Sequence, residues 1–132
     1  MSDEEPLVTL AYLLDNPPRE IIVNTEEGPM KIKIRDPTTQ DRINAILEAR
    51  KDPRWKDMTP EDRNGLILDL IAIKMIVEPK ISLEDYYKAN SLRLGNILNE
   101  VIMDYAKRLR KLTANRAKEI QDFLEQMRVN NP

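Results

Sequence analysis

Residues 59–78, TPEDRNGLILDLIAIKMIVE, decide the fold of this chain. Thr59 is a favourable N-cap, and Pro60 suits the first helical position because its missing N–H would have no partner there. The part from residue 66 to residue 77 is apolar on nearly every side, which is typical of a helix surrounded by protein. The sequence therefore predicts a buried central helix that ends at Glu78-Pro79.

A strand signal lies upstream of this helix, in REIIVNT (19–25) and MKIKIRD (30–36). Met30, Ile32 and Ile34 alternate with basic residues, so one face of the second run is apolar. The two runs flank Glu-Glu-Gly-Pro, which predicts a hairpin with a Gly-containing loop. A lone hairpin is only marginally stable in water, so we expect its apolar face to pack on helices.

The remaining segments have helical periodicity. We expect short helices over residues 7–14 and from Ser82, and a helix from about residue 38 to Arg50 with Ile43, Ile46 and Leu47 on its apolar side. A long amphipathic helix is predicted from Ser91, and a final one after Thr113, which is a possible cap.

These elements predict an α+β fold that is predominantly helical, with an N-terminal β-hairpin packed on a bundle of about four to five helices. The expected organisation is a disordered tail over residues 1–6 and a helix–hairpin–helical domain over residues 7–112. Residues 113–132 would form a C-terminal amphipathic helix that is either docked on the domain or bound to a partner.

The amino-acid composition excludes several kinds of catalytic and metal site. The 132 residues include no Cys and no His, so disulfides, thiolate chemistry and the commonest general base and metal ligand are excluded. The three Gly are too scattered to cradle a phosphate, and the paired acids Glu61/Asp62 and Glu84/Asp85 suit the first turns of helices. We therefore expect a protein that is not an enzyme, with no catalytic, cofactor or metal site.

The N-terminus begins with acidic residues, and its apolar stretch, Leu7 to Leu14, is too short to span a membrane. We therefore expect no export, no membrane segment and a cytoplasmic location.

The segment 107–118 is basic and suggests one alternative function, DNA or RNA binding by a small regulator. Its bases are Lys107, Arg108, Arg110, Lys111, Arg116 and Lys118. Acids resume at Glu119, and no aromatic residue lies within the segment for base stacking. These features favour a solvated basic face, which makes nucleic acid the less favoured partner.

Apolar stripes at both chain ends admit two interpretations. They can pack onto the central helix, or one can remain available to bind a partner helix in a groove. The candidate partner-binding residues are Leu10, Leu14, Ile120, Phe123, Leu124 and Met127.

Two segments carry a resemblance to a known family: MKIKIRDPTTQDR (30–42) and IVEPKISLEDYYKANSLRLGNILNEVI (76–102). Together with the apolar N-terminal stretch, they resemble tail assembly chaperones of long-tailed bacteriophages and related proviruses. The resemblance spans roughly residues 7–112, by the arrangement of its elements, and the charged helical segment after Thr113 departs from many members.

The resemblance implies a non-enzymatic factor, located in the host cytoplasm if viral, that binds and shields the helical tape measure protein during tail assembly. Such proteins are absent from the finished virion and often exist in two lengths through a translational frameshift. Self-association into a homo-oligomer is also expected, because an unoccupied apolar stripe tends to pair with itself. A permanent structural component of the tail is a further alternative.

Overall fold

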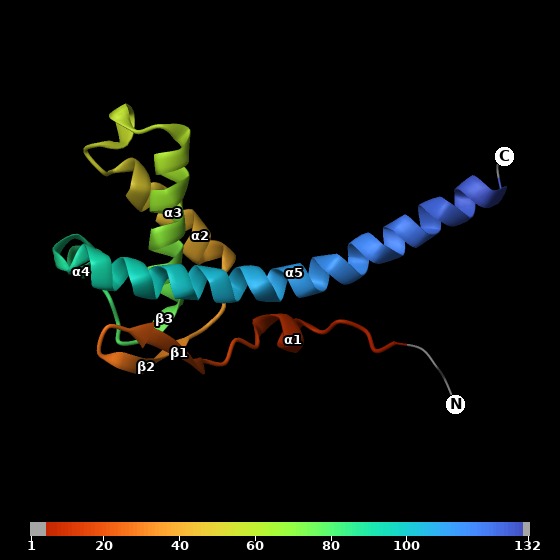
Figure 1. The fold of residues 1–132 in the computed structure, drawn as a ribbon, viewed down its shortest axis with the longest axis horizontal. Helices are drawn as coiled ribbons and strands as arrows, with labels where there is room; N and C mark the ends of the chain where they lie inside the picture. Colours follow the sequence, from red (N-terminus) through yellow and green to blue (C-terminus); the bar gives the residue numbers. More distant parts are fainter. Residues whose placement is uncertain (1–4, 131–132) are drawn as a thin grey trace.

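The computed structural model describes residues 5–130, without the side chains of residues 115, 117, 119 and 127–130. The prediction of a disordered tail over residues 1–6 falls mainly on residues outside this description. The fold is α+β and predominantly helical, as predicted (Figure 1). Its elements are α1 (Leu10–Leu14), β1 (Arg19–Thr25), β2 (Gly28–Ile34), α2 (Thr39–Arg50), a 3-10 turn (Trp55–Asp57), α3 (Pro60–Met75), β3 (Ile76–Glu78), α4 (Leu83–Lys88) and α5 (Ser91–Asn130).

Helix α3 is the central helix, as the sequence predicts. It packs against both α2 and α5, and Leu66, Leu70 and Met75 are buried on it. The Thr59 hydroxyl caps its start by accepting a hydrogen bond from the Asp62 N–H at 3.1 Å. The burial of this segment from several sides explains why its sequence is apolar nearly all round.

The end of the central segment differs from the prediction. Helix α3 stops at Met75, and Ile76–Glu78 forms a short strand that pairs antiparallel with β2. The β-branched residues Ile76 and Val77 favour the extended conformation once an open strand edge is available. The predicted hairpin is therefore part of a three-stranded sheet in the order β1-β2-β3.

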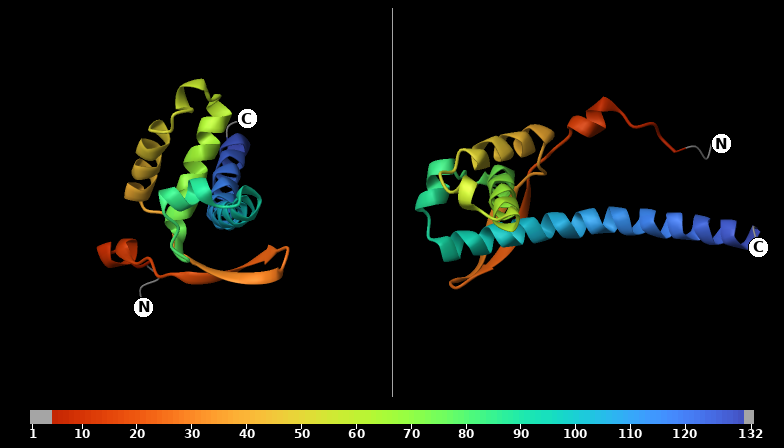
Figure 2. Two further views of the ribbon diagram at one scale, coloured as in Figure 1. Left: turned by 90° about the vertical axis from the view of Figure 1, so that its left-hand side faces the viewer. Right: turned by 90° about the horizontal axis from the view of Figure 1, so that it is seen from above.

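The sheet covers one side of the helices, with one face turned toward them (Figure 2). Val23, Ile32, Ile34 and Ile76 are buried on this face. Met30, which the alternation places with them, is mostly exposed near the hairpin tip. The loop is shorter than predicted because Thr25 pairs with Gly28, whose φ of 102° suits glycine at the end of the turn.

Helix α2 turns a different face inward from the one that its apolar pattern predicts. Its buried residues are Ala45 and Ala49, whereas Ile43, Ile46 and Leu47 are exposed. The small alanine side chains allow the backbones of α2 and α3 to approach closely, which larger side chains would prevent. The prediction was wrong because hydrophobicity alone does not distinguish a close helix contact from an exposed stripe.

A buried carboxylate organises the loop between α2 and α3. Asp52 is only 5% exposed, and it accepts hydrogen bonds from the Arg54 side chain, from the Arg54 N–H at 2.8 Å and from the Tyr87 hydroxyl at 2.7 Å. The Arg54 guanidinium is the main reason that the pKa of Asp52 lies well below its usual range. Because Tyr87 belongs to α4, this carboxylate joins the loop to that helix.

Removing this charge should destabilise the protein in a pH-dependent way. Asp52→Asn is expected to lower the free energy of unfolding by about 1–2 kcal/mol at pH 7. The lowered pKa means that the contribution is full above the unfolded-state value of about 3.9 and is lost as the pH falls toward the folded-state value. Urea unfolding at pH 7 and pH 3 measures this, and an undiminished difference at pH 3 would contradict it.

Two glycines lie inside helices without a close neighbour that would require them. Gly65 and Gly95 lie inside α3 and α5, where close helix packing is the usual reason for glycine, yet a Cβ at either position would meet no atom within 4 Å. Gly65→Ala and Gly95→Ala should each raise the free energy of unfolding by about 0.5–1 kcal/mol. The contrasting variant is Gly28→Ala, which should destabilise because of its positive φ. Thermal unfolding of the three variants checks the opposite signs.

Candidate partner-binding site

Helix α5 is a single helix over Ser91–Asn130. Asn90 caps its start, because the Asn90 side-chain oxygen accepts hydrogen bonds from the N–H groups of Leu92 and Arg93 at 3.0 and 3.1 Å. The helix therefore begins at Ser91, as predicted, and Asn90 is its N-cap. Neither α5 nor any other helix within residues 5–130 is apolar enough over sufficient length to cross a bilayer.

We call the sheet and helices α2, α3 and α4 the body. The predicted break at Thr113 does not occur, and residues 113–130 continue α5 away from the body (Figure 1). The Thr113 hydroxyl donates a hydrogen bond to the Leu109 carbonyl at 3.0 Å, one turn earlier in the same helix. This side chain is thus satisfied inside the helix and does not cap a new one. The prediction of a separate C-terminal helix was wrong, and the described part of that segment is not docked on the domain.

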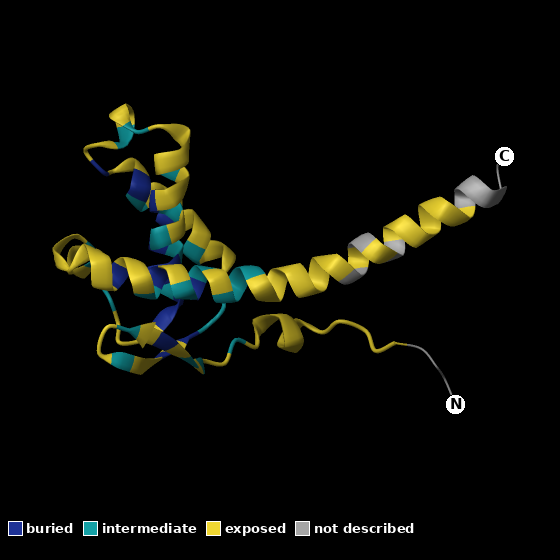
Figure 3. Cartoon of the chain, viewed as in Figure 1, coloured by how far each residue is buried: buried dark blue, intermediate teal, exposed yellow. Residues whose placement is uncertain are grey.

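One apolar stripe runs along most of α5 but is covered only in its first half. Leu94, Leu98 and Val101 are buried against the body. Figure 3 shows that α5 is exposed beyond the body. Apolar residues continue there with i+3 and i+4 spacing, and their side chains are about half to three quarters exposed. We define the distal stripe as Leu109, Leu112, Ile120, Phe123 and Leu124.

The N-terminal segment is exposed as well. Leu7 is 91% exposed, and Leu10 and Leu14 in α1 are also largely open to solvent. Helix α1 is confirmed, although it begins at Leu10, and Thr9 caps it through a hydrogen bond from the Tyr12 N–H at 3.1 Å. The interpretation in which both end segments pack onto the central helix is therefore wrong for the described residues.

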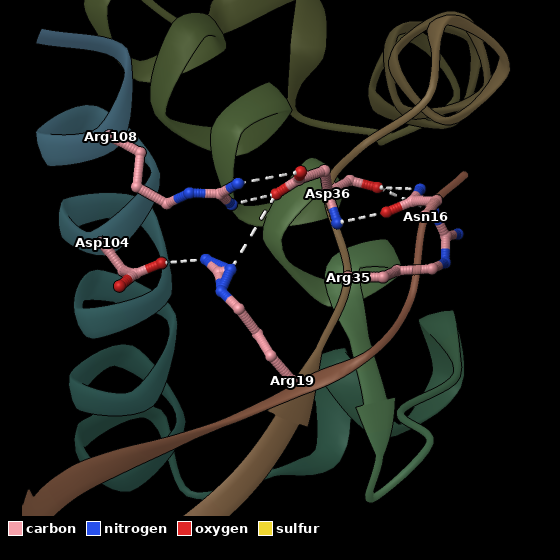
Figure 4. A network of polar contacts seen from close by, with 6 residues as sticks. All are labelled: Asn16, Arg19, Arg35, Asp36, Asp104 and Arg108. Carbon is pink, nitrogen blue, oxygen red and sulfur yellow. Dashed lines mark hydrogen bonds and ion pairs between the residues drawn. The ribbon is translucent and has the colours of Figure 1, made fainter. Parts of the chain in front are cut away.

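A polar network joins the two end segments where they leave the body (Figure 4). The Asn16 side chain exchanges two hydrogen bonds with the backbone of Asp36, at 2.9 and 3.0 Å. The Asp36 carboxylate forms a two-point ion pair with Arg108 of α5. Arg19 of β1 lies between the two segments, paired with Asp104 and 4.0 Å from Asp36.

This network determines where the two end segments leave the body. Asp36 contacts the N-terminal segment through Asn16 and the long helix through Arg108, so both segments leave the body from the same region. Figures 1 and 2 show them projecting toward the same side of the molecule. Both segments therefore carry exposed apolar side chains on the same side of the molecule.

Most of the predicted partner-binding residues lie in these segments. Leu10, Leu14, Ile120, Phe123 and Leu124 are all exposed, and the side chain of Met127 lies outside the described residues. Leu109 and Leu112 were missed because a break at Thr113 separated them from the final stripe. The i+3 and i+4 spacing from Leu109 through Leu112 to Ile120, which only Arg116 interrupts, was the signal that could have identified them.

The basic segment 107–118 is only partly assembled as one positively charged surface. At the usual turn per residue, Lys107, Arg110, Lys111 and Lys118 fall on one side of α5, whereas Arg116 lies in line with the distal stripe. Arg108 is held by Asp36, whose hydrogen bonds raise the pKa of the guanidinium. Phosphate contact by these four exposed bases stays an alternative, although no aromatic residue lies within the segment for base stacking.

Carboxylates do not form a metal site in the part of the chain that the structure describes, where no group of three or more is placed to hold an ion. The pairs Glu61/Asp62 and Glu84/Asp85 occupy the first turns of α3 and α4, as predicted. In the capping box of α4, the Asp85 carboxylate accepts a hydrogen bond from the Ser82 N–H at 3.0 Å, and the Ser82 hydroxyl accepts one from the Asp85 N–H at 3.1 Å. The bond from the Ser82 N–H is the main reason that the pKa of Asp85 is lowered. These carboxylates stabilise helix starts.

A hollow of about 600 Å³ lies between the hairpin tip and the start of α5. Met30, Leu92 and Ile97 contribute its apolar lining, and Arg93 bridges its edge to Glu27 at 3.2 Å. It lies next to the covered half of the α5 stripe, away from the distal stripe. Its lining offers space for a side chain, but it does not present the extended apolar face found at the chain ends.

The candidate site therefore consists of the distal stripe and the exposed N-terminal segment. The apolar side chains that the structure describes in this site are exposed to solvent. Comparison with known proteins finds no family model, no curated protein and no solved structure that matches this chain.

Proposed function

We propose that this protein is a phage or provirus tail assembly chaperone that binds and shields the helical tape measure protein during tail morphogenesis. The observation that carries the proposal is the distal stripe, an apolar helix face that extends the buried stripe of α5 beyond the body. The resemblance of residues 30–42 and 76–102 to that family indicates the tape measure protein as the client. The rest of the surface is strongly charged and keeps the complex soluble.

The mechanism is helix-to-helix shielding. An amphipathic helix of the client lies along the distal stripe, and the apolar residues of the N-terminal segment contact it from the side. Five large apolar side chains that go from about half exposed to buried contribute on the order of 1 kcal/mol each. Association opposes this with about 4 kcal/mol or more, so one copy binds weakly. Several copies along a long client would give a stable coat.

Coexpression with the tape measure protein of the same phage or provirus tests the proposal. With this chain present, most of the client is expected in the soluble fraction and in a complex that copurifies with the chaperone. Without it, the client is expected to aggregate. A client that is equally insoluble with and without this chain would contradict the proposal. Finding the chain in purified virions would instead identify a permanent tail component.

A further inference from the structure

The N-terminal segment buries none of residues 5–15. Every residue in this range is exposed, and the hydrogen bonds that the structure describes for these residues stay within the range. Helix α1 has no buried residue, and its five residues are too few to form a stable helix alone. The position of the segment therefore depends on the contacts of Asn16, the residue that follows it.

Asn16 pairs with the backbone of Asp36 through both ends of its side-chain amide (Figure 4). The Asn16 Nδ2 donates a hydrogen bond to the Asp36 carbonyl at 2.9 Å, and the Asn16 Oδ1 accepts one from the Asp36 N–H at 3.0 Å. The amide side chains of Asn and Gln present a donor and an acceptor side by side. Because both are used, the pair fixes the orientation of residue 16 as well as its position.

The backbone around Asp36 is itself held by three helices. The Arg35 N–H donates a hydrogen bond to the Met75 carbonyl at the end of α3, at 2.8 Å. The Arg35 guanidinium forms a two-point ion pair with Asp41 in the first turn of α2. On the third side, the Asp36 carboxylate pairs with Arg108 of α5. A segment that binds the backbone of residue 36 is therefore positioned relative to all three helices.

A stiff spacer joins Asn16 to strand β1. Pro17 and Pro18 fix φ at both positions, and Pro17 also restricts Asn16 to extended conformations. At the other end of the spacer, Arg19 pairs with Asp104 of α5. While the Asn16 amide is paired, both ends of the spacer are anchored, so the direction in which the N-terminal segment leaves is fixed.

We propose that the Asn16 side chain is a latch that couples the N-terminal segment to α5 through Asp36. While the amide pair is closed, the segment projects toward the same side of the molecule as α5 (Figures 1 and 2). When the pair opens, the segment moves independently of α5. A partner that contacts both segments then finds only α5 in place. This inference concerns the free chain and does not depend on the identity of a client.

The distance between two spin labels tests the proposal on the full chain, which has no native Cys that would also be labelled. Val8→Cys places one label in the N-terminal segment and Met103→Cys places the other on α5, at positions that are 72% and 41% exposed. With Asn16 intact, pulsed electron paramagnetic resonance should give one narrow distance distribution. Asn16→Ala removes both hydrogen bonds, so the ratio of latched to free chains should fall at least about tenfold and the distribution should broaden.

Asn96→Ala is the matched control, because the Asn96 amide of α5 also donates a hydrogen bond to a backbone carbonyl, that of Asn24, at 2.9 Å. It should leave the distribution narrow. Circular dichroism verifies that every variant keeps its helix content. A broad distribution with Asn16 intact, a narrow one in Asn16→Ala, or equal broadening in Asn96→Ala would each overturn the proposal. None of these results decides client binding, which the coexpression assay measures separately.

Discussion

Leu98→Ala is expected to lower the free energy of unfolding by about 3 kcal/mol, within the range for large-to-small changes in a core. Leu98 is 2% exposed and belongs to the core that joins α5 to α3 and the sheet. Its truncation removes several buried methyl groups and leaves a cavity that the surrounding elements can fill only in part. Urea unfolding monitored by circular dichroism measures the change.

The control for this variant lies on the same stripe. Leu112 is two heptads further along α5 and is 72% exposed. Leu112→Ala should change the free energy of unfolding by less than about 0.5 kcal/mol. Equal losses for the two variants would show that the distal half of α5 contributes to the core, and would contradict its assignment as a binding surface. Measurements at low protein concentration exclude a contribution from self-association.

The second large effect is expected on binding of the tape measure protein. The double variant Leu112→Asp/Phe123→Asp places two charges on the distal stripe, where a bound client helix would bury them. A loss of about 1–2 kcal/mol at each position corresponds to roughly 100-fold weaker binding. We therefore expect the tape measure protein to return to the insoluble fraction when it is coexpressed with this variant. The ratio of soluble to insoluble client is the measurement.

Leu92→Asp provides the control, because it adds a charge at a similarly exposed position on α5 without touching the distal stripe. It should keep the client as soluble as wild type does. The free energy of unfolding of the double variant should also remain close to wild type, which excludes misfolding as the cause. A double variant that solubilises the client fully would show that the client binds elsewhere.

Elements with strong local signals could be predicted from the sequence. The central helix was identified from its apolar character, and the starts at Thr59 and Ser82 from their capping residues, because both signals act within one turn. Strand β3 could not be predicted, since Ile76 pairs with β2 from more than 40 positions away in the chain. Long-range pairing leaves no local periodicity.

The candidate site was only partly predictable for a related reason. Ile120, Phe123 and Leu124 were identified as available for a partner, but the pattern that places Leu98 in the core is the same pattern that places Leu112 in solvent. Only the arrangement of the body along α5 decides where the covered part of the stripe ends. The ion pair of Arg108 with Asp36 was likewise hidden, because it joins residues 72 positions apart.

Hydrogen exchange of α5 with and without the bound tape measure protein tests the central claim most directly, at concentrations below self-association. In the free chain, amides of residues 94–105 should exchange slowly and those of residues 109–124 quickly, because only the first group is covered by the body. Binding of the client should slow exchange over residues 109–124. Protection that appears instead on α2 or α3, with residues 109–124 unchanged, would contradict this account of how the protein works.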